Sequence, residues 1–184
     1  MKARVLQIRR PDPPFMAAET GTSRRPYDST LVPPVKAKVT PGVNWKFFKG
    51  IFPWIPQVAT LKAEASGKAS QPELHAVHQD KNGMLFFYGY IRVPEDGKYT
   101  FYMKARTKAF LRIHDAQVID EDHGYQGGTE KKASVFLQAG LHPFRLYYDN
   151  KKNSGPLLDF EWSGPGIARQ KIESRYFFSN KKQR

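Results

Sequence analysis

The feature that most constrains the fold is a series of short apolar and aromatic runs, each closed by glycine, proline, aspartate or asparagine. The series begins near Trp45 and continues almost to the end of the chain. Within the runs, apolar side chains recur at every second position, which is typical of strands with one buried and one solvated face. No long amphipathic helical pattern accompanies them. We therefore predict an all-β chain.

The predicted strands are rich in β-branched and aromatic residues, which favour extended backbone. In one of them Tyr99, Phe101 and Met103 alternate with Thr100, Tyr102 and Lys104. The strands are residues 84–93, 98–105, 109–113, 118–119, 134–138, 142–149 and 157–163. At least seven short strands at near-regular spacing predict an antiparallel β-sandwich or a closed barrel.

Two turn sequences predict hairpins. Residues 94–97, Pro-Glu-Asp-Gly, separate strands 84–93 and 98–105, and Asp-Gly supplies the positive backbone angle that a tight turn needs. Residues 150–155, Asn-Lys-Lys-Asn-Ser-Gly, separate strands 142–149 and 157–163 and are typical turn residues. We expect each turn to join two neighbouring strands.

The formal net charge of +13 is concentrated outside the predicted sandwich. Residues 1–40 carry eight Lys/Arg and three acids, residues 168–184 carry six and one, and residues 41–167 carry sixteen and thirteen. Residues 1–40 are also rich in proline, which predicts an extended arm. We expect a Pro-rich basic arm or linker at 1–40, a sandwich at 41–178 and a basic tail at 179–184. We favour the interpretation that these basic arms keep the chain soluble over the interpretation that they bind a polyanion. In the alternative, the arms bind an acidic polysaccharide or a membrane surface. Nucleic acid is disfavoured as a partner.

Several function classes are excluded or disfavoured. The chain has no cysteine, which rules out disulfides, thiolate zinc sites and a thiol nucleophile. No apolar run approaches the roughly 20 residues that span a bilayer, and residues 1–10 lack the apolar region of a signal peptide. Asp159 and Glu161 share a strand face, but a solvated pair is favoured over a glycosidase dyad. We predict no enzymatic activity.

Two further groups of residues have competing interpretations. Acidic and imidazole side chains gather at His114, Asp115 and residues 120–123, where a solvated loop is favoured over a metal site. Among the tryptophans, Trp45 and Trp162 are expected in the core. Trp54, in the segment Phe-Pro-Trp-Ile-Pro, is the better candidate for stacking on a sugar ring, although burial of so large a ring is still favoured.

The order of the motifs resembles one family. The motifs are residues 45–50 with a later Leu61, then 87–101, 109–113, 139–148 and 161–166. Each is only a strand pair or a turn, but five in this order, within a match from about residue 42 to residue 178, resemble a protective-antigen (PA-14) domain. The resemblance implies a two-sheet β-sandwich that serves as an accessory module in secreted glycosidases, adhesins and toxins, often binding carbohydrate.

The resemblance also implies a ligand site, from which this chain departs. In carbohydrate-binding members, the loop after the strand equivalent to 99–104 carries two consecutive aspartates that hold calcium. Here that loop reads Ala105-Arg106-Thr107-Lys108. Calcium prefers several anionic oxygens, and Arg106 with Lys108 would repel it, so we expect no calcium or other cofactor.

Two interpretations of this loop stay open. Arg106 is solvated, or Lys104, Arg106 and Lys108 form a cationic patch that recognises an acidic group such as a sulfate or uronate. Thr107 is a further candidate ligand-binding residue of this loop. The resemblance also points to a second loop, in which Asp149, Asn150, Lys151 and Asn153 would add polar contacts to a ligand. The competing interpretation is that these residues only form a polar turn. No residue is predicted to bind metal.

The sequence therefore predicts a non-catalytic accessory module that binds carbohydrate, with an acidic or sulfated glycan as its possible ligand. The alternative is a structural domain that packs on the catalytic domain of a larger secreted hydrolase, such as a sulfatase or glycosidase, and has no ligand of its own. By resemblance, the module is expected to be secreted, periplasmic or at the cell surface.

Overall fold

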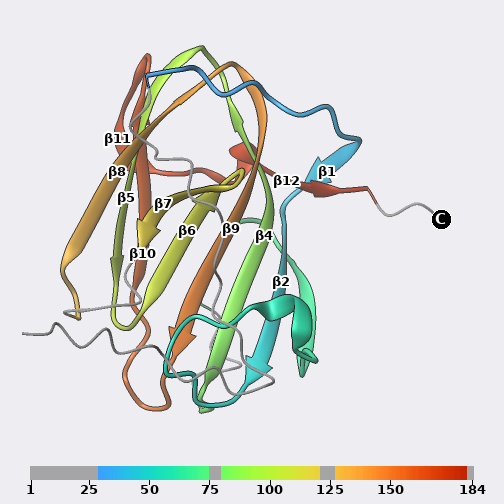
Figure 1. Ribbon diagram of the computed structural model, residues 1–184, viewed down its shortest axis with the longest axis vertical. Helices are drawn as coiled ribbons and strands as arrows, with labels where there is room; N and C mark the ends of the chain where they lie inside the picture. The colour runs from blue at the N-terminus through green and yellow to red at the C-terminus, as the bar shows by residue number, and fades with distance from the viewer. Residues whose placement is uncertain (1–28, 75–79, 121–126, 182–184) are drawn as a thin grey trace, which may run out of the picture.

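The computed structural model describes residues 29–74, 80–120 and 127–181, and it consists of two antiparallel sheets that pack face to face (Figure 1). The predicted all-β antiparallel sandwich is confirmed. All seven predicted strands are present within a few residues of their expected bounds. No helix in the described ranges is long and apolar enough to cross a membrane.

The larger sheet is built around two long strands that pair along their whole length, β4 and β9. Strand β6 lies on the other side of β9, and β2 and β12 share the free edge of β4. The eight strands are β1 (Val39–Pro41), β2 (Val43–Lys49), β3 (Ala65–Ala69), β4 (Gly83–Val93), β6 (Ala109–Ile113), β7 (Ala116–Asp120), β9 (Gly140–Asn150) and β12 (Phe177–Asn180).

The smaller sheet has the strand order β11-β10-β5-β8. Its strands are β5 (Gly97–Ala105), β8 (Glu130–Leu137), β10 (Leu158–Gly164) and β11 (Ile167–Lys171). Two short 3₁₀ turns, η1 (Val58–Thr60) and η3 (Ser174–Tyr176), lie in connections. Because β5 has partners on both sides, its outward-facing side chains lie in the middle of a sheet face.

Both hairpin predictions are wrong in their pairing, although the strands are where the sequence placed them. Strand β4 pairs with β2, β9 and β12, whereas β5 pairs with β8 and β10, so the turn at 94–97 crosses from one sheet to the other. Side chains close it: the Tyr99 hydroxyl donates to the Glu95 carbonyl at 2.8 Å, and the Asp96 carboxylate accepts from the Ala139 amide at 2.6 Å. Strands β9 and β10 likewise belong to different sheets.

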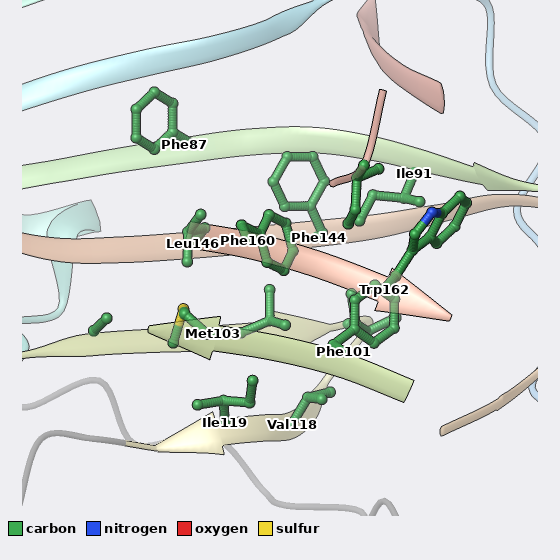
Figure 2. Packing of buried hydrophobic residues seen from close by; sticks show 14 of the residues in the cluster. Phe87, Ile91, Phe101, Met103, Val118, Ile119, Phe144, Leu146, Phe160 and Trp162 are labelled. Atoms are coloured by element: carbon green, nitrogen blue, oxygen red, sulfur yellow. The ribbon is translucent and has the colours of Figure 1, made fainter. Parts of the chain in front are cut away.

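The core lies between the two sheets, where the inward side chains of both sheets meet (Figure 2). Tyr99, Phe101 and Met103 of β5 are all buried there, as is Trp162, whose ring centre lies 5.6 Å from that of Tyr99 and 4.8 Å from that of Tyr176. Trp45 is only partly buried but packs against the same cluster. The core assignment is confirmed for Trp162, whereas Trp45 lies at the margin of the core.

A second apolar cluster covers part of the outer face of the larger sheet. The segment 50–64, between β2 and β3, folds back over the outward aromatic side chains of β4, β6 and β9. The buried members of this cluster are Phe48, Phe52, Ile55, Met84, Phe86, Phe110 and Tyr147. We call this segment the cover. It explains why residues such as Phe86 and Tyr147, which point away from the main core, are nevertheless buried.

Ordered structure extends to both sides of the predicted 41–178 sandwich. Strand β1 begins at Val39, and β12 ends at Asn180 with Ser179 fully buried. The Val32 amide donates to the Phe136 carbonyl at 2.8 Å, and the Val35 amide donates to the Leu141 carbonyl at 2.9 Å. The described part of the predicted arm therefore lies against β8 and β9.

Candidate functional site

The two loops that the sequence singled out leave the sandwich at the same end. Residues 106–108 connect β5 to β6, and residues 151–157 connect β9 to β10. Both connections cross between the sheets, and they lie side by side (Figure 1). We call this end of the sandwich the loop end. The Arg106 amide donates to the Leu157 carbonyl at 2.9 Å, and the Asp149 amide donates to the Lys108 carbonyl at 2.9 Å.

Thr107 links the two loops through its side chain. It is buried, with 4% of its surface exposed, and its hydroxyl donates to the Asp149 carbonyl. Burial raises the pKa of the neighbouring Tyr148 phenol, and a hydrogen bond with Thr107 offsets part of that rise. The role of Thr107 is thus to hold the loops together, since a buried hydroxyl offers little to a ligand.

Asp149 and Asn150 also face inward rather than outward. Asp149 is 4% exposed and Asn150 9% exposed. The Asn150 amide group donates to the Lys81 carbonyl at 2.7 Å, and the nearby Asn82 side chain accepts from the Lys152 amide at 2.9 Å. These contacts fix the start of the second loop on the loop that precedes β4.

The exposed members of the predicted site are cationic or amide side chains. They are Lys104, Arg106, Lys151 and Asn153. Asn153 has a positive φ of 61°, a conformation that asparagine tolerates better than most residues. Lys108 is half-buried, and its ammonium group donates to the Pro53 carbonyl of the cover. Of the predicted basic triplet, Lys104 and Arg106 are therefore the exposed members.

Trp54 does not present its ring to solvent. Its exposed fraction is 9%, and it lies in the cover close to the Pro53 carbonyl that accepts from Lys108. A ring this deeply buried cannot stack on a sugar without movement of the cover. The burial alternative that the sequence favoured for Trp54 fits the structure, and its stacking role does not.

The loop end does not fit calcium. The loop at 106–108 offers two cationic side chains and one hydroxyl, and that hydroxyl already donates to the Asp149 carbonyl. A hard divalent cation requires six to eight oxygen ligands, preferably anionic. Across residues 29–74, 80–120 and 127–181, no three His, Asp or Glu side chains come close enough together to hold a metal ion.

The remaining sequence candidates have structural partners. His114 lies 2.8 Å from His142, ring nitrogen to ring nitrogen, and the other ring nitrogen of His142 lies 2.7 Å from the Gln138 carbonyl. Glu161 of the predicted solvated pair forms an ion pair with Arg169 at 2.7 Å. Residues 121–123 of the predicted acidic loop lie outside the described residues.

Comparison with known proteins identifies one family and several structural relatives. A family model described as PA14 domain matches residues 57–176. An anti-sigma factor domain-containing protein has a TM-score of 0.65 at 15% identity, and the match covers 80% of this chain and 50% of that one. This chain therefore spans about half the length of that relative.

Two further relatives are described by the sugars they bind. The subtype-switched Epithelial Adhesin 9 A domain from Candida glabrata, in complex with beta-lactose, has a TM-score of 0.60 at 10% identity and covers 82% of this chain and 95% of its own. A PA14 sugar-binding domain from an RTX adhesin has a TM-score of 0.56 at 14% identity and covers 77% and 99%. Such low identities establish the fold alone. No curated protein matches the chain.

Proposed function

Since the chain belongs to the PA14 domain family, we propose that it is a non-catalytic accessory module that binds carbohydrate at the loop end. The relatives described as sugar-binding support this class of ligand. As an accessory module of a larger protein, it would act in a secreted, periplasmic or cell-surface context.

The observation that carries the proposal is the hydrogen-bonded frame of the loop end. Backbone bonds from Arg106 to Leu157 and from Asp149 to Lys108, together with the Thr107 hydroxyl, hold two loops in one arrangement. The frame displays Arg106 and Asn153 at the surface. Preorganised loops lose little conformational freedom when a ligand binds, which favours affinity.

The side chains at the loop end favour an acidic sugar. Arg106 offers a planar fork of donors that matches a carboxylate or sulfate in two parallel hydrogen bonds. Lys104 and Lys151 add positive charge nearby, and Asn153 adds an amide for sugar hydroxyls. Arg106 takes the place in this loop where calcium-holding relatives would carry an acid, so the anionic group of the ligand meets the guanidinium directly.

The test is calorimetric titration of the whole chain with a sulfated oligosaccharide and its unsulfated counterpart. We expect the sulfated sugar to bind more tightly, and Arg106→Ala to weaken its binding about tenfold or more, because a charge-assisted bidentate contact is lost. The matched control is Arg92→Ala, which removes an exposed arginine at the opposite end of β4, where it lies over the Phe178 ring.

Two outcomes would contradict the proposal. Equal binding of both sugars by the wild type and by Arg106→Ala would remove the role of Arg106. A glycan array on which the chain binds nothing would favour the alternative role, a structural domain that packs on a catalytic domain.

A further inference from the structure

A groove lies on the outer face of the smaller sheet, and Lys104 is the next outward residue of β5 after its lining residue Tyr102. Its volume is about 490 Å³. Its lining comes from the outward side chains of two neighbouring strands, β5 and β8: Lys98, Thr100, Tyr102, Lys132, Ala133, Ser134 and Phe136. We call this the β5–β8 groove. Its lining side chains are exposed or half-buried in the described part of the chain.

The floor of the groove is made of hydroxyl groups. The Thr100 and Ser134 hydroxyls lie 2.8 Å apart, and the Tyr102 hydroxyl lies 3.2 Å from that of Ser163. A hydroxyl donates once and accepts twice, so each pair keeps the capacity to bond further hydroxyls. The backbone of β5 is paired with β8 and β10, so a ligand in the groove meets side chains and not backbone groups.

The charge of the groove is positive. Lys98 and Lys132 are its charged lining residues, and no acid lines it. They stand about 13 Å apart along the strands, because Tyr102, the register partner of Lys132, lies four positions after Lys98. Both are exposed, and the half-buried Phe136 opposite Lys98 adds an apolar surface.

The nearby acids are held by Arg169. This arginine pairs with Glu161 at 2.7 Å and with Glu130, and its guanidinium lies 4.2 Å from the centre of the Tyr102 ring. The hydrogen bonds to both carboxylates raise the pKa of Arg169 further. Arg169 offsets one of the two negative charges. In the strand register Glu161 lies level with Tyr102, and Glu130 lies level with Lys104.

We propose that the β5–β8 groove is a second binding site, independent of the loop end, for a linear anionic glycan. Two separated ammonium groups attract carboxylate or sulfate groups along a chain, paired hydroxyls match sugar hydroxyls, and Phe136 offers an apolar face to a sugar ring. This combination fits a glycan better than an acidic peptide, since paired hydroxyls and an apolar face match the hydroxyl groups and the ring of a sugar.

The test isolates the groove in the Arg106→Ala chain, in which the principal anion contact of the loop end is removed. Calorimetry would use three probes: a heparin-derived sulfated hexasaccharide, its desulfated counterpart and hexaglutamate. In this background we expect the sulfated hexasaccharide to bind, and Lys98→Gln with Lys132→Gln to weaken that binding about tenfold or more, because two charge-assisted contacts are lost. Added salt should weaken it too.

The matched control is Lys62→Gln with Lys68→Gln, which removes the same charge from exposed lysines beside and within β3. We expect the control to bind as its parent does. An equal loss in the control, unchanged affinity in the Lys98 and Lys132 variant, or equally tight binding of hexaglutamate would overturn the proposal. Loss of all binding on Arg106→Ala alone would overturn the groove proposal but support sugar binding at the loop end. The two proposals can therefore fail separately.

Discussion

Part of the outer face of the eight-stranded sheet lies under the cover, whereas the described residues that line the groove on the four-stranded sheet are exposed or half-buried. On the first, the cover buries Phe86, Phe110 and Tyr147, which are outward aromatic side chains of β4, β6 and β9, in a second apolar cluster. On the second, the outward side chains of β5 and β8 are mostly lysines and hydroxyls around a groove. Exposed apolar area is costly in water. The aromatic side chains of the first face therefore need the cover, whereas the polar side chains of the second face can meet a ligand.

The largest expected effect comes from truncating an aromatic ring under the cover. Phe86 is 7% exposed and lies 4.7 Å from the Tyr147 ring, centre to centre. Phe86→Ala should lower the free energy of unfolding by about 3–5 kcal/mol. Phe136→Ala, in the β5–β8 groove, should lower it by less than about 1.5 kcal/mol, because that ring is only half-buried. Urea unfolding measures both, and equal losses would erase the distinction between the faces.

Trp54→Ala sharpens the same comparison within the cover. If the ring is a structural part of the cover, as its burial indicates, the substitution should lower the free energy of unfolding by about 3 kcal/mol. Thermal unfolding followed by circular dichroism would measure it. A variant that kept wild-type stability but lost sugar binding would instead restore the stacking role.

A pH effect is expected from His142, which is fully buried near the start of β9, an interior strand of the larger sheet. Burial lowers the pKa of His142 below its ordinary value of 6.5, and its bond to the Gln138 carbonyl opposes this in part. Between the lowered pKa and about 6.5 the unfolded chain binds more protons than the folded one, so stability falls as pH decreases through this window. Above this pH window, the contribution of neutral His142 to the free energy of unfolding is fully present.

The measurement compares urea unfolding at pH 7.5 and pH 5 in the wild type and in His142→Gln, whose side chain does not titrate. The wild type should lose more stability on acidification than the variant does. Equal losses in the two proteins would show that His142 does not couple folding to protonation.

The smallest expected effect on stability is that of Arg106→Ala. Arg106 is exposed, and surface substitutions away from caps and buried networks change stability by less than about 0.5 kcal/mol. Its backbone amide keeps the bond to Leu157 in the variant. Denaturant unfolding should therefore not distinguish the variant from wild type, whereas a loss above about 1.5 kcal/mol would make Arg106 a structural residue.

The alternation of apolar and polar residues predicted the strands well, because it depends only on residues that are close together in the sequence. It placed Tyr99, Phe101 and Met103 inward, and all three are buried. The pairing of strands could not be predicted the same way. An Asp-Gly turn suits a hairpin, yet at residues 94–97 the chain crosses to the opposite sheet and the two buried faces meet across the core.

The candidate site was predictable in position but not in detail. The family resemblance pointed to both loops, and the structure brings them together. Burial of Thr107, Asp149 and Asn150 could not be foreseen, since polar side chains in turns are usually exposed. The β5–β8 groove was also missed, because it depends on β5 and β8 becoming neighbours across a long sequence separation.

The most direct test of the central claim, that the loop end binds sugar, is a map of backbone amide chemical shifts as a sulfated oligosaccharide is added to the isotope-labelled chain. We predict shifts at Arg106, Lys151 and Asn153, separable from any at Thr100 and Ser134 in the groove. Binding that left the amides of 105–108 and 150–155 unchanged would contradict the account.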